Sequence, residues 1–479
     1  MSYLGGETSG LGPENLKGTV VGVGVTAFPR TGLPGFVPGY RIACIRRTGD
    51  LPAVRRTAEV FCLEEAEGRP LPEAADSCAL LSRPVTRRYL AQLPQPVYLL
   101  LYQPSFEIEE LARKNGWRLL ANPAALRVRT GDRAFFQRLV ASLGLPAVPG
   151  GIVSLERFKE RSYEAWARDV GPRVVIQLPD MLRGGGRSTF FLDSEGDMRR
   201  FKGLISSNEW QGIPLKRVSV RKFVKGEPSS VTGCILGKKA VISPLQRQII
   251  DPSWVEGVPS KGVFGGHSWG GEIWGERVEE EARSQGLAVA RVLAAMGYRG
   301  VFGLDLLVDR SCGQVVPIEL NPRLTGALPV LSQLQAEQGE IPLELLHFLS
   351  FLGSLTPFEC VIPTKACSGR IQGAHIVLFR GLGSMRKVQP RAGLYAVGES
   401  TARVQWIGEA AGPGDIRDKN QVILVDGPPM GRAEGLGKTD PLERIGRLVF
   451  SGPVLTPEGR FRPGVLDVVE QMQGLMLER

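Results

Sequence analysis

Residues 300–323 read GVFGLDLLVDRSCGQVVPIELNPR, which is two apolar runs separated by a polar, glycine-containing turn at 309–313. This pattern is typical of two antiparallel strands joined as a hairpin. Side chains alternate between the two faces of a strand. We therefore expect Asp305, Glu319 and Asn321 to lie on one face of the hairpin.

The expected register of this hairpin follows from the length of its turn. Pairing Val308 with Gln314 across the five-residue turn places Asp305 opposite Pro317. A shift of one residue would move a whole set of side chains to the other face, so the register decides which groups converge.

Two carboxylates and an amide oxygen are hard ligands of the kind that Mg²⁺ accepts, and Mn²⁺ is an alternative cation. Mg²⁺ usually keeps positions open for water and substrate phosphates, which predicts a nucleotide site. The competing interpretation is a solvated hairpin face without a ligand. The joint spacing of Asp305, Glu319 and Asn321, followed by Arg323, favours the metal site.

A second element is the segment Arg183-Gly184-Gly185-Gly186, which follows an expected strand at 173–178. Successive glycine N–H groups can form a concave anion-binding nest, and the neighbouring arginine adds positive charge. A flexible hairpin tip has the same composition, so this motif alone does not decide between the two interpretations.

The rest of the chain predicts an α/β and α+β protein of about three domains, given a soft prior of ~150 residues per domain and its 479 residues. Apolar runs between residues 17 and 122 alternate with helical stretches, which predicts a small βαβ-type, mainly parallel sheet. Residues 277–296 are expected to form a long helix. The region after residue 355 is β-rich and glycine-rich, which predicts a separate C-terminal domain.

Composition excludes several classes of protein. The hydrophobic fraction is 43% and the charged fraction 23%, which is typical of folded globular chains. The seven cysteines form no CxxC pair and the three histidines no HxH or HExxH motif, so disulfide and zinc frameworks are not expected. The net charge of +10 occurs without an RNA-binding aromatic motif, so nucleic acid is not the expected partner.

Neither a signal peptide nor a membrane span is expected. The first residues lack a basic segment followed by an apolar core. The longest apolar runs, such as 97–102, are far shorter than the ~20 residues that cross a bilayer. We therefore expect a cytoplasmic protein.

The order and separation of the glycine-rich segment and the acidic hairpin resemble those of the ATP-grasp superfamily, over about residues 126–331. In addition, Gly131-Asp132-Arg133 followed by LPAVPG at 145–150 is similar to the "GDK…GVPxVPG" entry of the biotin carboxylase and carbamoyl-phosphate synthetase branch. The resemblance implies an ATP-grasp fold over 126–352, with a lid at about 173–222. It also implies an N-terminal pre-ATP-grasp domain over 1–125 and a β-rich C-terminal domain over 353–479.

The resemblance also implies roles for individual residues. Arg133 and Gln177 stand where the family usually has phosphate-binding lysines, and Gln177 cannot supply the charge. Arg323 is similar to the arginine that follows the metal ligands and would act on the reacting groups. The remaining ATP contacts implied are the lid residues Arg183, Gly184, Gly185 and Gly186, the adenine hinge Lys222, Phe223 and Val224, and Glu227 near the ribose.

A ligase that uses Mg·ATP to join a small carboxylate to an amine, such as an amino acid or peptide, is the function that the resemblance implies. The alternatives are a bicarbonate-using carboxylase and a nucleotide-binding or nucleic-acid-binding protein that has lost catalysis. No biotinyl "MKM" motif occurs in the chain. A homodimer is compatible with every one of these functions.

Overall fold

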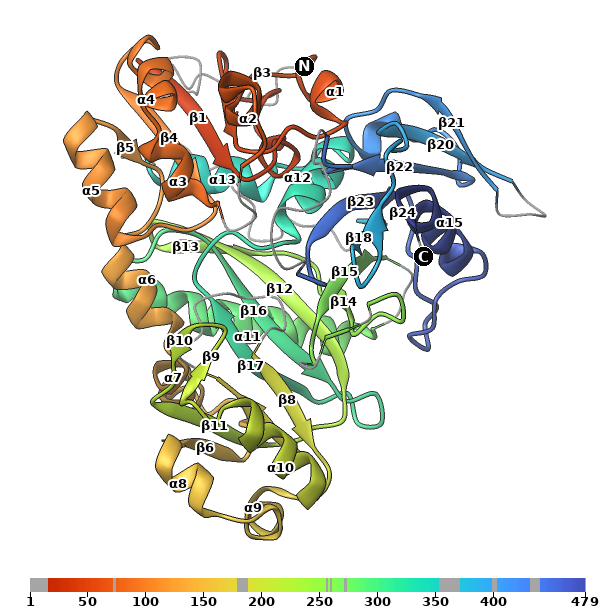
Figure 1. Cartoon of the computed structure of the whole chain (residues 1–479). Coiled ribbons are helices and arrows are strands. Elements are labelled where there is room, and N and C mark those ends of the chain that lie inside the picture. The colour runs from red at the N-terminus through yellow and green to blue at the C-terminus, as the bar shows by residue number, and fades with distance from the viewer. Residues whose placement is uncertain are drawn as a thin grey trace.

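The computed structural model describes residues 16–71, 75–178, 188–255, 257–258, 261–270, 274–352, 371–398, 403–430 and 440–478. Three sheets organise the chain. A parallel sheet lies at the N-terminal end, a small antiparallel sheet projects at the opposite end, and a large antiparallel sheet runs between and beside them (Figure 1).

The N-terminal sheet is parallel throughout, as its sequence predicts, in the order β3-β2-β1-β4-β5. Its central strands are almost wholly buried and apolar, because helices cover a parallel sheet on both faces. The chain order reverses between β1 and β4, so the loops after these strands open a crevice at the carboxyl edge. The strands are β1 (Thr19–Gly24), β2 (Arg41–Cys44), β3 (Glu59–Cys62), β4 (Val97–Leu101) and β5 (Arg118–Leu119).

Local capping fixes the helices of this region. In α5 (Phe106–Asn115) the Ser105 hydroxyl accepts the Ile108 N–H, and Gly116 ends the helix in the left-handed conformation. In α7 (Arg133–Ser142) the Asp132 carboxylate accepts the Phe135 N–H. The other helices are η2 (Phe28–Arg30), α1 (Leu51–Val54), α2 (Leu63–Glu67), α3 (Ser77–Ser82), α4 (Pro84–Ala91) and α6 (Ala124–Gly131).

The small sheet has its own apolar core and projects away from the rest (Figure 1). Its strand order is β6-β11-β7-β8, and all neighbouring pairs are antiparallel. The strands are β6 (Gly150–Ser154), β7 (Val174–Gln177), β8 (Thr189–Leu192) and β11 (Arg217–Lys222). Helices α8 (Leu155–Glu160), α9 (Tyr163–Val170) and α10 (Glu195–Leu204), and the pair β9 (Glu209–Trp210) and β10 (Ile213–Pro214), complete the subdomain.

The large sheet begins with the segment that follows the small sheet. Its strands here are β12 (Glu227–Leu236), β13 (Lys239–Ile242), β14 (Gln246–Ile250), β15 (Phe264–Trp269), β16 (Gly300–Val308) and β17 (Val315–Asn321). Helix α11 (Glu276–Ala295) packs against this part with a buried face of Val278, Ala282, Val289 and Leu293. Helices α12 (Leu328–Glu337) and α13 (Leu343–Ser350) follow. No described helix is long and apolar enough to cross a membrane.

The C-terminal region is β-rich, as expected, but its strands extend the same large sheet instead of forming a sheet of their own. Strand β15 pairs with β18, and the order continues β18-β23-β22-β20-β21. The elements are β18 (Gly373–Phe379), β19 (Ser384–Met385), β20 (Gly393–Val397), β21 (Val404–Gly408), η3 (Pro413–Asp415), β22 (Gln421–Val425), β23 (Arg444–Phe450), α15 (Val465–Met476) and β24 (Leu477–Glu478).

Candidate active site

The hairpin of β16 and β17 forms, but the register expected for it is wrong. Val308 pairs with Val315, one residue beyond the expected Gln314, and the Asp309 N–H bonds to the Gln314 carbonyl at 2.9 Å. A β-bulge beside Asp305 then shifts the pairing again, so that Asp305 lies directly opposite Glu319 instead of Pro317. The bulge brings two carboxylates together.

Hydrogen bonds hold Asp305 in place. Gln248 Nε2 donates to Asp305 Oδ1 at 2.9 Å, and Asn321 Nδ2 donates to Asp305 Oδ2 at 2.9 Å. Arg323 Nη2 donates to Asn321 Oδ1 at 2.9 Å, and its Nη1 donates to the Tyr102 hydroxyl from the N-terminal sheet. Asp305, Asn321 and Arg323 therefore form one hydrogen-bonded group, and Glu319 lies opposite Asp305 in the hairpin.

The charges in this group are poorly balanced. Burial, and then the negative charge of Glu319, raise the pKa of Asp305 to about 7, against the opposing effect of Arg323. A divalent cation between the two carboxylates would remove this repulsion, so the donor set fits Mg²⁺. The side-chain amide of Asn321 would have to turn its oxygen inward, and amide orientation is assigned from such contacts.

The protein would supply only part of a metal shell here. No cluster of three or more His, Cys, Asp or Glu side chains able to hold a metal occurs in the described ranges. With Asp305, Glu319 and Asn321 as ligands, phosphate oxygens and water would complete an octahedral Mg²⁺ site.

Four arginines lie around the same site. Arg133 Nη1 donates to Gln177 Oε1 at 2.9 Å, and its Nη2 lies 3.5 Å from Glu319 Oε2. Burial and the charge of Arg133 lower the pKa of Arg221 to about 10.

Arg221 is buried on β11, and within the described chain its Nε has no hydrogen-bond partner. The pKa of Arg127 is lowered by burial and by Arg323. Arginines that crowd together in a partly buried site favour an anionic ligand with several oxygens.

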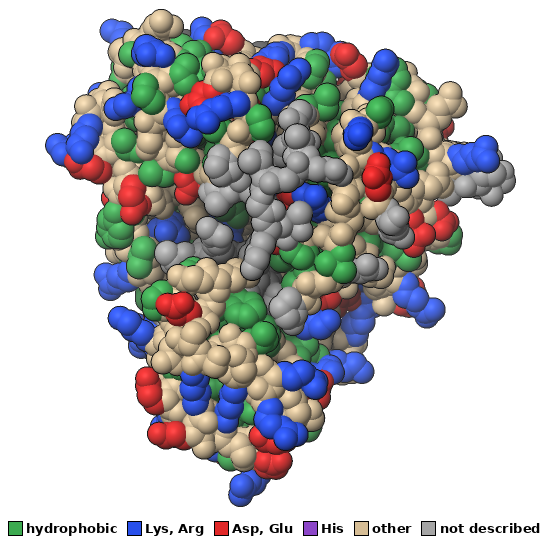
Figure 2. Space-filling model, viewed as in Figure 1, with side chains coloured by type: hydrophobic (Ala, Val, Ile, Leu, Met, Phe, Trp, Pro, Cys, Tyr) green, Lys and Arg blue, Asp and Glu red, His purple; other side chains and the backbone are tan. Residues whose placement is uncertain are grey.

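These groups line a cavity of about 1590 Å³ between the three sheets. The N-terminal loops that follow β1 and β4 form one wall, including Thr26 and Tyr102, and the large sheet forms the floor. On the outer surface shown in Figure 2, basic and acidic side chains are intermixed without a continuous basic patch.

The structure brings most of the predicted ATP contacts to this cavity. Arg133, Gln177, Lys222, Phe223 and Val224 all line it. Glu227 is absent from the lining. Its carboxylate forms ion pairs with Arg247 and Arg310. The predicted lid residues Arg183, Gly184, Gly185 and Gly186 lie outside the described residues.

Several cavity residues were not predicted as site residues from the sequence. Tyr102 and Arg127 gave no signal, because their place in the site depends on how the N-terminal sheet docks on the hairpin. Alternation along β11 offered one clue, since it places Arg221 with Ser219 on the face opposite the apolar Val218 and Val220.

Comparisons with known proteins agree with this geometry. Residues 193–327 match a family described as "ATP-grasp domain". Among curated sequences, the arginine-specific large chain of carbamoyl phosphate synthase from Bacillus subtilis is 21% identical over 234 residues, which cover 48% of this chain and 20% of that protein. The C-terminal section of the carbamoyl phosphate synthase large chain from Aquifex aeolicus is 23% identical over 223 residues, which cover 46% of this chain and 37% of that protein. The chain therefore spans only a fraction of these relatives.

Solved structures are similar over nearly the whole chain. N5-carboxyaminoimidazole ribonucleotide synthetase from Thermus thermophilus has a TM-score of 0.51 at 13% identity, covering 95% of this chain and 96% of that one. The biotin carboxylase domain dimer of 2-oxoglutarate carboxylase from Hydrogenobacter thermophilus, solved with MgADP, ADP and bicarbonate, has a TM-score of 0.55 at 14% identity, covering 91% and 87%. These likenesses confirm the fold expected from the sequence.

Proposed function

We infer that this chain, a member of the ATP-grasp superfamily, is an ATP-dependent ligase that activates a substrate carboxylate for attack by an amine. The observation that carries the proposal is the pairing of two facing carboxylates with a group of arginines in one large cavity. Such a site suits a triphosphate with a divalent cation, because each provides the charge that the other side lacks.

The proposed reaction begins when an oxygen of the substrate carboxylate attacks the γ-phosphorus of ATP. The bond between that phosphorus and the β–γ bridging oxygen breaks, which yields an acylphosphate and ADP. The amine then attacks the acyl carbon, and phosphate leaves with the former carboxylate oxygen. The amine loses a proton in this step.

The residues of the chain would act mainly by positioning and charge neutralisation. Asp305, Glu319 and Asn321 would hold Mg²⁺, which offsets phosphate charge when bound. Arg133 and Arg221 lie beside Glu319 and would contact phosphate oxygens. Arg323, held by Asn321 and Tyr102, would stabilise the negative charge that develops on the acyl oxygen.

The hinge between the small sheet and β12 would hold the adenine. Lys222, Phe223 and Val224 lie at the end of β11 and line the cavity, so their backbone groups can meet a base edge. The Phe223 ring packs against Phe191 with 5.5 Å between centroids, which fixes this end of the small sheet.

A second candidate is a bicarbonate-using carboxylase. It is favoured by the structural likeness to a biotin carboxylase domain solved with bicarbonate. Bicarbonate would then take the place of the substrate carboxylate and attack the γ-phosphorus of ATP. A dimer is compatible with both functions, since that relative is described as a dimer.

The test is ADP and phosphate release from Mg·ATP in the presence of amino acids, dipeptides or bicarbonate, each with and without a second amine. The ligase function predicts release that needs one acid and one amine and disappears in Glu319→Gln. Glu160→Gln, an exposed carboxylate on α8, is the matched control and should behave as wild type. Release with bicarbonate alone supports the carboxylase, and nucleotide binding without turnover contradicts both.

A further inference from the structure

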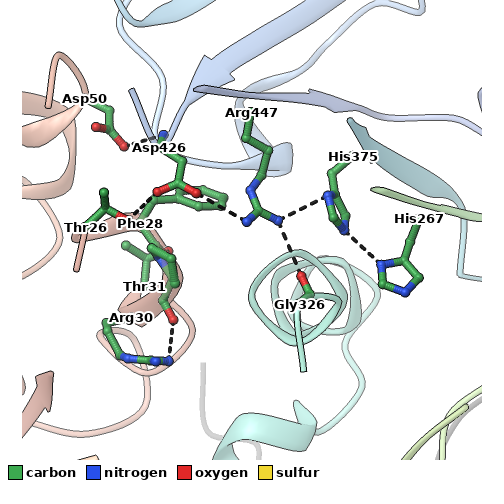
Figure 3. A network of polar contacts seen from close by, with 11 residues as sticks. Thr26, Phe28, Arg30, Thr31, Asp50, His267, Gly326, His375, Asp426 and Arg447 are labelled. Atoms are coloured by element: carbon green, nitrogen blue, oxygen red, sulfur yellow. Dashed lines mark hydrogen bonds and ion pairs between the residues drawn. The ribbon is translucent and has the colours of Figure 1, made fainter. Parts of the chain in front are cut away.

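A chain of buried polar groups runs along the cavity floor on the C-terminal side of the large sheet (Figure 3). Asp426 accepts hydrogen bonds from the Thr26 hydroxyl and from Arg447 Nη2, the latter at 3.2 Å. Arg447 Nη1 lies 3.1 Å from His375 Nδ1, and His375 Nε2 lies 3.1 Å from His267 Nδ1. The chain therefore connects the N-terminal sheet to three adjacent strands, β23, β18 and β15.

Arg447, the donor at one end of this row of hydrogen bonds, determines which ring nitrogen of each histidine carries the hydrogen. A guanidinium can only donate, so His375 Nδ1 must accept from Arg447. A neutral His375 then carries its hydrogen on Nε2 and donates it to His267 Nδ1. His267 must accept there, which leaves its own hydrogen on Nε2.

Both imidazoles are neutral at physiological pH. Burial and the charge of Arg447 lower the pKa of His267 to about 3 and that of His375 well below its usual value. The relative exposure of His267 is 3% and that of His375 is 0%.

His267, at the other end of this row of hydrogen bonds, faces the cavity. His267 lines the cavity, and none of the described residues forms a hydrogen bond with its Nε2. On the neighbouring strand it pairs with Gln248, whose side chain bonds Asp305. Three strand spacings separate β15 from β16, which is roughly 14 Å between the two strands in a flat sheet, and the Gln248 side chain lies between His267 and Asp305.

We propose that Arg447 and His375 hold His267 as the Nε2–H tautomer, so that His267 donates a hydrogen bond to an oxygen of the carboxylate substrate far from its reacting carboxyl group. Arg447 and His375 are positioning residues, and His267 determines specificity. A substrate that reaches both ends is longer than bicarbonate and carries an oxygen acceptor near its distal end. This substrate assignment rests on the ligase function, whereas the tautomer assignment does not.

The tautomer is tested directly by long-range ¹H–¹⁵N correlation spectra of the full chain labelled with [¹⁵N]histidine. The chain has only three histidines, so three spin systems are expected, each assigned with a His→Gln variant. His347 is an internal reference, since its Nδ1 accepts the Val301 N–H at 3.0 Å and its Nε2 lies 3.1 Å from the Leu120 carbonyl. The Nε2–H form of His267 supports the proposal, and the Nδ1–H form overturns it.

An Arg447→Met variant tests whether Arg447 sets the tautomers. His375 and His267 should become mixtures of tautomers, while an unchanged His347 signal shows that the chain remains folded. If His267 stays wholly Nε2–H in a folded Arg447→Met protein, Arg447 does not position it.

Kinetics test the substrate contact. His267→Phe, which removes the donor, should raise the KM for the carboxylate substrate about tenfold, as the loss of one hydrogen bond does, and leave the KM for ATP unchanged. His267→Gln, which places an N–H near Nε2, should restore most of the loss. An unchanged carboxylate KM in His267→Phe overturns the contact. If no acid supports ADP release, the ligase function fails and the substrate contact with it, while the spectrum still decides the tautomer.

Discussion

Two places in the large sheet, the hairpin of β16 and β17 at one edge and the neighbourhood of β23, handle buried charge in opposite ways. On β16 and β17, Asp305 and Glu319 face each other, and the adjacent Arg221 has a guanidinium nitrogen without a partner in the described chain. On β23 the Arg447 guanidinium pairs with Asp426 and orients two neutral histidines. We call the first place the incomplete end, because like charges face each other there, and the second the complete end, because unlike charges pair there; within the described chain the Nε atoms of Arg221 and Arg447 both lack a hydrogen-bond partner. A buried charge without an opposite charge beside it points to the binding of a ligand, whereas a buried charge in an ion pair points to a role in positioning neighbouring side chains.

The largest effect is expected from removing a charge at the incomplete end. Glu319→Gln should reduce ADP release about 10³-fold, because a metal ligand that neutralises phosphate charge is lost. Thermal stability without nucleotide should not fall, since the repulsion with Asp305 is relieved. Steady-state assays and thermal unfolding of the same sample measure both. A large loss of thermal stability in the absence of nucleotide would contradict the proposed repulsion between Asp305 and Glu319.

At the complete end the same kind of change should cost stability. Arg447→Met leaves Asp426 buried without its cation, which should lower the free energy of unfolding by about 4 kcal/mol. Denaturant unfolding measures the change, with the affinity for ATP expected to stay near that of wild type. The control is Arg56→Met, because Arg56 forms an exposed ion pair with Glu409 and should change stability by less than about 1 kcal/mol. An equal loss of stability in the two variants would contradict the proposed role of the Arg447–Asp426 pair.

Glu344 on α13 sharpens the comparison, because it is a buried carboxylate whose oxygens have no hydrogen-bond partner in the described chain. Burial raises its pKa to about 7 from an ordinary 4.5, despite the nearby charge of Arg30. The folded state therefore holds the proton more tightly than the unfolded state. Its contribution is fully present below pH 4.5 and is lost as pH rises to about 7.

Glu344→Gln should remove this pH dependence. At pH 8 the variant should be more stable than wild type by up to about 3 kcal/mol, and at pH 4 the two should be nearly equal. Thermal unfolding across this pH range compares them. A variant less stable than wild type at pH 8 would show that the ionised carboxylate has a stabilising partner.

The smallest effect is expected at Arg133, since Arg221 lies beside it. Arg133→Gln should weaken ATP binding about tenfold, and Arg133→Lys should weaken it less, because lysine keeps the charge but not the forked geometry. Titration calorimetry with Mg·ADP and Mg·ATP separates the contribution of the γ-phosphate. No change in either affinity would remove Arg133 from the phosphate site.

The sequence predicted the parts of the site that are set by local pattern. The hairpin, the common face of Asp305, Glu319 and Asn321, and the parallel N-terminal sheet all follow from alternation within short segments. The register did not, because it depends on a bulge and on backbone hydrogen bonds in the turn that no spacing rule reveals.

Contacts between distant segments were also missed. Tyr102 reaches Arg323 across 221 positions, and Asp426 reaches Thr26 across 400. A β-rich C-terminal domain was predicted from the sequence, but not that β18 pairs with β15 and extends the large sheet. Strand pairing of this kind is decided by the packing of the whole molecule, which single-sequence periodicity does not encode.

The central claim is that a carboxylate oxygen of the substrate becomes bonded to phosphorus, and oxygen transfer tests it most directly. An acid that supports ADP release is labelled with ¹⁸O in its carboxyl group, and the released phosphate is analysed by mass spectrometry. Carboxylate activation predicts one ¹⁸O atom in each phosphate, because the acyl carbon gives up that oxygen to the phosphate when the amine attacks. Phosphate without ¹⁸O would mean that water attacks ATP, which would contradict the account.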